Sequence, residues 1–192
     1  MNILINRIED IIENRGIDIK NFDTDFRTSI QFELLMQDPK FSIQTKIKQA
    51  LRLYYIDINK IKDYDKALED IIWFYIGEKE EITKDVKNNR KKQIYSYEFD
   101  DELIYAAFKD QYRIDLQDVE YLHWWKFKAM FSGLKKSNFI VEIMGYRSID
   151  LNKIKDKNER SMYKELQQQY ALPDMRTQAQ KEADFGAMFW KT

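Results

Sequence analysis

The stretch at residues 115–134, DLQDVEYLHWWKFKAMFSGL, decides the fold. Its side chains are apolar on almost every face from residue 121 to residue 134, which is typical of a helix that several other helices cover. Asp115 is the expected N-cap of this helix, and Asp118 three residues later imitates a capping box. Gly133 and the lysines after it suit a helix C-terminus. The stretch therefore predicts a long central helix around which the rest of the chain packs.

Helical periodicity continues on both sides of this stretch. Before it, apolar residues recur at helical spacing in four segments, at residues 2–14, 24–37, 42–54 and 63–75, and near it they do so at residues 100–112, 139–147 and 157–170. Asp23 or Thr24 is the expected N-cap of the second segment. The third has the most regular period, with Ile43, Ile47, Ala50, Leu51 and Tyr54 on one face.

The scarcity of glycine and proline supports an all-α fold. The 192 residues include 5 Gly and 2 Pro, too few for a sheet with tight turns or for a glycine-rich phosphate loop. We expect a helical bundle of about eight to ten helices joined by short turns. The pattern divides the chain into an N-terminal bundle at 1–78, a basic linker or arm at 79–94, a C-terminal helical domain at 95–172 and a tail at 173–192.

Charge and composition exclude several classes of protein. The net charge is −1, so a generic nucleic-acid binder is not favoured as a function. Without Cys the chain forms no disulfide and no thiolate site, which suits a reducing compartment. The longest apolar stretch is shorter than the roughly 20 residues that span a bilayer, so no membrane partner is expected.

The residues offer little for catalysis. With no Cys and a single His, His123, the sequence lacks the common nucleophile–base pairs, and it contains no phosphate-binding loop, zinc motif or dinucleotide fingerprint. His123 is interpreted as a core residue whose ring nitrogens find partners inside the fold. We therefore expect no enzyme activity, no catalytic or metal-binding residues and no cofactor.

Three features remain as candidates for binding. Trp124 and Trp125 lie about 100° apart on a helix, so either both are internal or one, here Trp124, contacts a partner. The terminal aromatic cluster packs either on the chain's own core or on a partner, and it comprises Phe185, Met188, Phe189 and Trp190. The basic run is either a solvated loop or an electrostatic contact surface, and its cations are Lys87, Arg90, Lys91 and Lys92.

Several motifs together resemble the gene-product-fifteen family of bacteriophage tail proteins. The first is Asp23-Thr24-Asp25-Phe26-Arg27, followed by Gln31-Phe32-Glu33. The second is the run at residues 95–134, with Asp-Asp before Leu-Ile-Tyr-Ala-Ala-Phe, the turn Gln-Tyr-Arg-Ile-Asp-Leu and Leu-His-Trp-Trp-Lys-Phe. The segment from Phe139 to Arg147 extends the likeness, which covers most of residues 20–170. Arg113 stands where Gly is usual. The signature core comprises Tyr105, Phe108, Tyr112, Asp115, His123, Trp125 and Phe127.

The resemblance implies a tail assembly chaperone. Such proteins are thought to coat the tape measure protein, a long apolar helical chain, until tail tube subunits polymerise around it. The implied partners are the tape measure protein, the tail tube protein and a second copy of this chain in a homo-oligomer. The implied location is the host cell cytoplasm during assembly, with absence from the mature virion. Two alternatives stay open: a structural or adaptor component retained in the virion, and a nucleic-acid-binding regulator that uses the basic run.

Overall fold

The computed structural model describes residues 4–77 and 93–174. Within these ranges the chain forms eight α-helices and two short 3-10 helices, and no strand. The helices of the first range are α1 (Ile8–Asn14), α2 (Phe26–Gln37), α3 (Ile43–Tyr54), η1 (Ile58–Lys60) and α4 (Tyr64–Ile76). Those of the second are α5 (Asp101–Tyr112), α6 (Trp124–Ser132), α7 (Phe139–Ser148), η3 (Leu151–Lys153) and α8 (Lys157–Gln169). The prediction of an all-α fold is confirmed.

Helix ends follow the capping residues in the sequence. The Ser42 hydroxyl accepts a hydrogen bond from the backbone N–H of Thr45 at the start of α3, and Asp63 accepts one from Lys66 at the start of α4. These side chains satisfy N–H groups that have no partner within their helix. Gly77 ends α4 at φ 92°, a left-handed conformation that favours glycine. Local sequence therefore sets these helix boundaries.

Two of the expected helices are shorter than predicted. The first begins at Ile8 rather than at residue 2, and Leu4 and Ile5 before it are 91% and 79% exposed. The central helix begins at Trp124 rather than after Asp115, because residues 115–123 form turns and an extended segment. Asp115 accepts a hydrogen bond from the backbone N–H of Gln117 in this turn and caps no helix.

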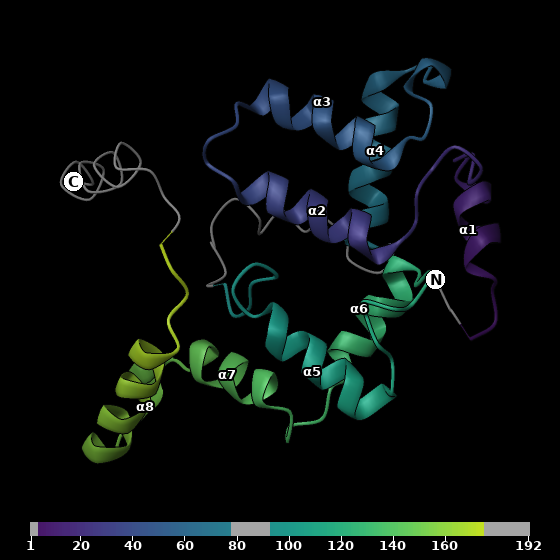
Figure 1. The fold of residues 1–192 in the computed structure, drawn as a ribbon. Coiled ribbons are helices and arrows are strands. Elements are labelled where there is room, and N and C mark those ends of the chain that lie inside the picture. Colours follow the sequence, from purple (N-terminus) through teal and green to yellow (C-terminus); the bar gives the residue numbers. More distant parts are fainter. Residues whose placement is uncertain (1–3, 78–92, 175–192) are drawn as a thin grey trace.

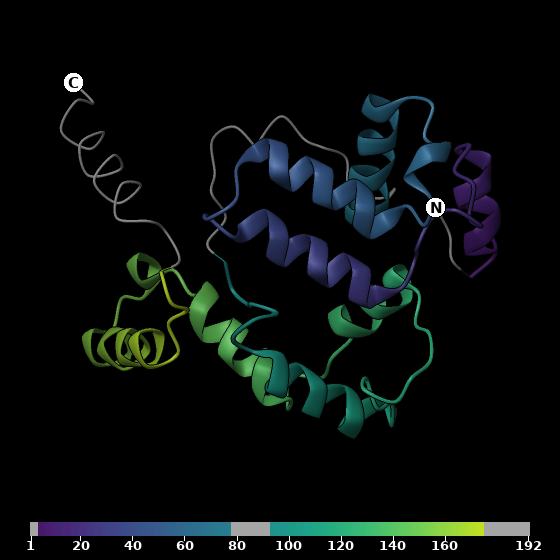
Figure 2. The same cartoon turned by 45° about the horizontal axis from the view of Figure 1, so that its top comes forward.

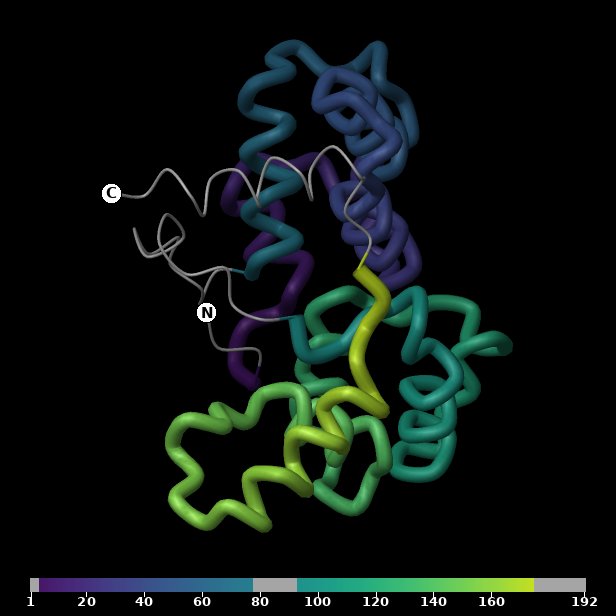
Figure 3. Tube along the Cα trace, turned by 90° about the vertical axis from the view of Figure 1, so that its left-hand side faces the viewer, coloured from purple at the N-terminus to yellow at the C-terminus, as the bar shows by residue number. Residues whose placement is uncertain are grey.

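Helix α2 lies at the centre of the arrangement. It packs against α3 on one side and against α6 on the other, while α4 packs on α3 (Figure 1). On the far side of α6, α5 packs against α7, and α8 packs on α7 (Figures 1 and 2). Seen from the side, α2 to α4 form an upper part and α5 to α8 a lower part, and the purple segment with α1 runs down beside them (Figure 3). The predicted division at 79–94 falls mostly outside the described residues.

Aromatic rings from both parts meet in one core. Phe74 of α4 contacts Phe22 and Tyr54 edge to face, and it stacks on Trp125 of α6 at 5.4 Å between ring centroids. Phe127 stacks on Phe26 at 4.9 Å and also on Phe108. Such ring pairs add about 0.5–1.5 kcal/mol each beyond the burial of their area. The two halves of the sequence therefore share a continuous aromatic interior.

The apolar face predicted for the third helix is only partly used. Ala50, Leu51 and Tyr54 are buried, but Ile43 and Ile47 in the first half of α3 are 60% and 38% exposed. Helix α2, on which α3 packs, is followed directly by the turn at Asp38 and Pro39. The N-terminal half of α3 keeps part of its apolar face on the surface.

Candidate functional site

The motif at residues 23–27 forms the entry to α2. Asp25 is the N-cap, with its carboxylate accepting a hydrogen bond from the backbone N–H of Arg27 at 2.9 Å. The cap predicted from the sequence, Asp23 or Thr24, is one or two residues too early. Asp23 instead supports the turn before the helix, because its carboxylate accepts hydrogen bonds from the backbone N–H of Asp25 and from the Thr28 hydroxyl.

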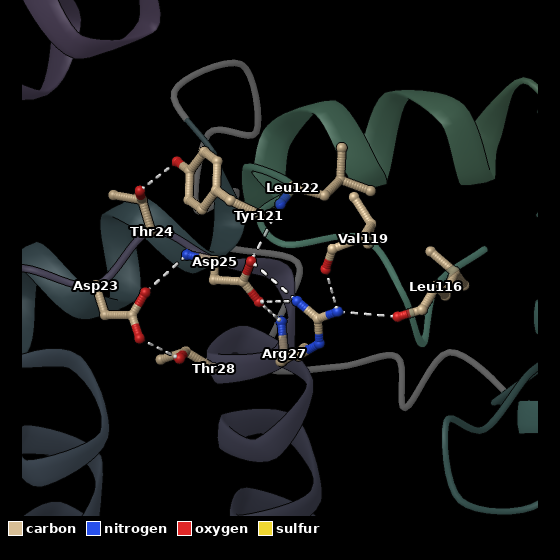
Figure 4. A network of polar contacts seen from close by, with 9 residues as sticks. All are labelled: Asp23, Thr24, Asp25, Arg27, Thr28, Leu116, Val119, Tyr121 and Leu122. Atoms are coloured by element: carbon tan, nitrogen blue, oxygen red, sulfur yellow. Dashed lines mark hydrogen bonds and ion pairs between the residues drawn. The ribbon is translucent and has the colours of Figure 1, made fainter. Parts of the chain in front are cut away.

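This motif also holds the loop at residues 115–123, which comes from the other half of the chain. The Arg27 guanidinium donates to the backbone carbonyls of Leu116 and Val119 at 3.0 and 2.7 Å (Figure 4). The second oxygen of Asp25 accepts from the backbone N–H of Leu122, and the hydroxyls of Thr24 and Tyr121 are 2.6 Å apart (Figure 4). Charge-assisted bonds of this kind are about twice as strong as neutral ones.

Backbone hydrogen bonds complete the junction. The N–H of Phe26 donates to the carbonyl of Leu122, and the N–H of Trp124 donates to the carbonyl of Thr24, both at 2.9 Å. Asp25 and His123 thus form an isolated antiparallel bridge. An extended backbone is required for these pairings, so residues just before Trp124 are unable to be helical. The contact with residues 24–26 therefore explains why α6 starts late.

Both adjacent tryptophans are internal. The Trp124 indole N–H donates to the carbonyl of Tyr75 at 2.9 Å, and that of Trp125 donates to the carbonyl of Phe74 at 2.7 Å. The Lys128 ammonium reaches the carbonyl of Ile76, so α6 satisfies carbonyls at the end of α4 that have no partner within that helix. Trp124 is 2% exposed. Of the two alternatives that the sequence left open, the structure thus supports the one in which both rings are internal, and Trp124 presents almost no surface to a partner.

His123 caps α6 with its ring. Its Nδ1 accepts a hydrogen bond from the backbone N–H of Trp125 at 3.0 Å. The Nε2 atom is buried and has no hydrogen-bond partner among the described residues, contrary to the expectation that both nitrogens are satisfied. Burial, with a smaller effect of Lys126, lowers the pKa of His123 to about 4. The ring is therefore neutral near pH 7 and serves as a cap inside the core.

The other signature residues support the loop and the core. Phe108 and Phe127 are fully buried. The Tyr105 hydroxyl donates to the Asp115 carboxylate at 2.9 Å, and the ammonium of Lys109 also contacts this carboxylate. Hydrogen bonds from Lys109 and Tyr105 lower the pKa of Asp115 to about 2. The Tyr112 hydroxyl donates to the carbonyl of Met130.

A groove of about 430 Å³ opens where these motifs meet. We call it the signature groove. Its apolar lining includes Phe26 and Ile30 of α2, Tyr97, Tyr105 of α5 and Phe127 of α6, and of these Ile30 and Tyr105 are partly exposed while Phe26 and Phe127 are buried. The first sequence motif supplies α2, the Asp-Asp-Glu-Leu-Ile-Tyr run supplies α5, and the Leu-His-Trp-Trp-Lys-Phe run supplies α6. The motifs that carry the family resemblance therefore surround one cavity.

Charge at this groove is mainly acidic. Asp101 and Glu102 line it from the first turn of α5, and both are exposed. The cation among its lining residues, Arg27, is already bound to Asp25 and to two carbonyls. Pockets with an apolar floor and a few polar groups at the edge suit ligands with an apolar body. The signature groove therefore suits apolar side chains that a basic residue accompanies.

The remaining predicted contacts lie outside the described residues. These are the basic run, Lys87, Arg90, Lys91 and Lys92, and the terminal cluster, Phe185, Met188, Phe189 and Trp190. The role of Arg27 was missed at the level of sequence. The available signal was a cation in the first turn of a helix, where the dipole disfavours it. Such a residue is held by acceptors from elsewhere in the fold.

The described residues offer no candidate for a metal site or for a membrane-spanning helix. In residues 4–77 and 93–174, no group of three or more His, Asp or Glu side chains is placed to hold a metal ion. No helix in these ranges is long and apolar enough to cross a membrane.

Comparison with known proteins identifies a family. A family model described as Bacteriophage Gp15 protein matches residues 5–172. That range contains every motif around the signature groove and ends where the chain leaves the last described helix. Comparisons with curated proteins and with solved structures find no match.

Proposed function

The chain belongs to the bacteriophage Gp15 protein family, and we propose that it is a tail assembly chaperone that binds the tape measure protein, keeps it soluble and helps recruit tail tube subunits. The observation that carries this proposal is the signature groove, an apolar cavity with an acidic edge at the meeting point of the family motifs. In this role the chain acts in the host cytoplasm during assembly and is absent from the finished particle.

The tape measure protein, here called the client, needs a partner that binds its apolar surface. A long helical chain with apolar stripes self-associates unless a partner covers those stripes. A helix laid over the signature groove inserts apolar side chains between α2 and α5, and a lysine or arginine one turn away meets Asp101 or Glu102. Each contact is small, which allows the tube subunits to displace it. Many copies along one client supply the overall strength.

Co-expression with the tape measure protein of the same phage tests the proposal. We expect the tape measure protein to stay soluble and to co-purify with the unaltered chain. Ile30→Glu, which puts a charge in the groove, and Glu102→Lys, which reverses the edge, are expected to reduce co-purification at least several-fold. Matched controls are Ile72→Glu and Glu69→Lys, on exposed positions of α4 away from the groove.

The outcomes separate two failures. An insoluble tape measure protein with nothing bound to the unaltered chain refutes the chaperone function. Equal co-purification by the groove variants and their controls refutes the groove as its site. Mass spectrometry of purified particles distinguishes a chaperone, which is missing there, from a structural component, which is present in stoichiometric amount.

A further inference from the structure

A second groove lies at the other end of α2. Its volume is about 460 Å³, and it is formed by the end of α2, the α2–α3 connection, residues 93–99 and Leu172 with Pro173. We call it the α2–α3 groove. Its two lining aromatics, Phe41 and Phe99, are 46% and 42% exposed. Large aromatic side chains lose much favourable burial when they are left half exposed, so this groove favours an apolar occupant.

The chain itself leads into this groove. After α8, residues 170–174 run away from that helix toward the level of α2 and α3 (Figures 1 and 3). Leu172 and Pro173 line the groove, and residues 175–192 follow at once. The match to the family ends at residue 172. Residues 173–192, which follow the match, therefore begin at the wall of this groove. Apart from Pro173, the residues that line the groove lie within the match.

This segment carries side chains of the right kind. Residues 185–190 read FGAMFW, and Phe185, Met188 and Phe189 have the i, i+3, i+4 spacing that places side chains on one helical face. Eleven residues, 174–184, separate this cluster from Pro173 in the groove wall, and a chain of that length reaches at most roughly 40 Å. The covalent connection thus keeps the cluster within reach of the groove and makes binding there an intramolecular event.

We propose that residues 185–190 bind in the α2–α3 groove of the same molecule and cover Phe41 and Phe99. The groove volume lies within the range of about 300–1,000 Å³ that holds small ligands, so it has room for more than one ring. The terminal aromatics then dock on the chain's own fold. This proposal concerns a single chain, and it stands or falls independently of binding to the tape measure protein.

Fluorine NMR of the full chain labelled with 5-fluorotryptophan tests it. Trp190 gives one of four resonances, and Trp190→Phe identifies it by its loss. The difference in its chemical shift between H₂O and D₂O reports how much solvent reaches the ring. We expect a small difference in the unaltered chain, rising to that of a free indole in Phe41→Lys and in Phe99→Lys. Tyr64→Lys, at an exposed position on α4 away from the groove, is expected to leave it small.

The other three resonances, from Trp73, Trp124 and Trp125, serve as an internal check that each variant is folded. A Trp190 ring that is fully solvated in the unaltered chain overturns the proposal. So does a ring that stays protected in both groove variants. Protection that appears only as the protein concentration rises assigns the groove to the segment of a second copy, and it overturns docking within one chain.

Discussion

Replacing Arg147 by Met is expected to destabilise the fold more than most single changes. The Arg147 side chain is 7% exposed and forms a two-pronged ion pair with Asp100, whose side chain is 3% exposed, at 2.6 and 3.0 Å. The same guanidinium donates to the carbonyls of Tyr170 and Ile94 at 2.6 and 3.1 Å. It therefore ties α7 to the start of α5, to the end of α8 and to the chain entering the second half.

The expected loss of unfolding free energy follows from the buried carboxylate that Arg147→Met leaves without a partner charge. Methionine fills a similar volume, but the Asp100 carboxylate then stays buried without its counter-charge, while the backbone N–H of Ser96 still donates to it. Breaking a buried pair in this way costs about 3–5 kcal/mol. In a chain of this size each kcal/mol lowers the melting temperature by about 2–4 °C. We expect a loss of about 10 °C, measured by circular dichroism, and a matching loss in urea unfolding.

A double-mutant cycle makes the test specific. Asp100→Asn with Arg147→Met removes both charges, so the double variant should cost less than the sum of the single ones. The control is Lys153→Met, which removes an 85% exposed lysine 4.0 Å from Asp150 and should change stability by less than about 0.5 kcal/mol. If Arg147→Met also stays within about 1 kcal/mol of the unaltered chain, the ion pair does not clamp these helices together.

Three further changes test the interior and the turn. Trp125→Ala empties a 4% exposed site and should cost about 3–5 kcal/mol in urea unfolding. Arg113→Gly should raise the free energy of unfolding by about 0.5–1 kcal/mol in the same assay. Arg113 has φ 58°, a left-handed conformation in which a residue with a Cβ is strained and glycine is not. The pKa of His123 is about 4 in the folded chain, against an ordinary value of 6.5 for an exposed histidine, so the unfolded chain binds more protons between these values. The contribution of His123 to the free energy of unfolding is therefore complete above pH 6.5, and it declines by up to about 3 kcal/mol as the pH falls toward 4. His123→Asn keeps a capping acceptor, and its unfolding free energy should fall less between pH 7 and pH 5.

Helices with local signals were predictable from the sequence. Ser42 and Asp63 precede apolar periods, Asp38-Pro39 and Gly77 follow them, and the structure places helix ends at these residues. These signals act within a few residues of one another, so one sequence is enough to find them. The same holds for the acidic first turn of α5 at Asp101.

The loop before Trp124 was not predictable in this way. Its composition fits a helix, but Asp25, nearly a hundred positions earlier in the chain, accepts from Leu122 and pairs with His123. Tertiary hydrogen bonds thus override the local preference for a helix. Arg113 is a related case, since an arginine gives no sign of the left-handed conformation at φ 58°, which a glycine would adopt without strain.

Two kinds of residue lie in the family motifs or directly beside them. Asp25, Arg27 and His123 each form hydrogen bonds within the chain that hold the fold together, so changing them tests folding. Ile30 and Glu102 line the signature groove, and Glu102 is exposed there at the acidic edge. A loss of client binding in variants of this second group, at unchanged stability, therefore reports on the groove itself. Such a loss in the first group reports only that the two halves of the chain no longer hold the groove in shape.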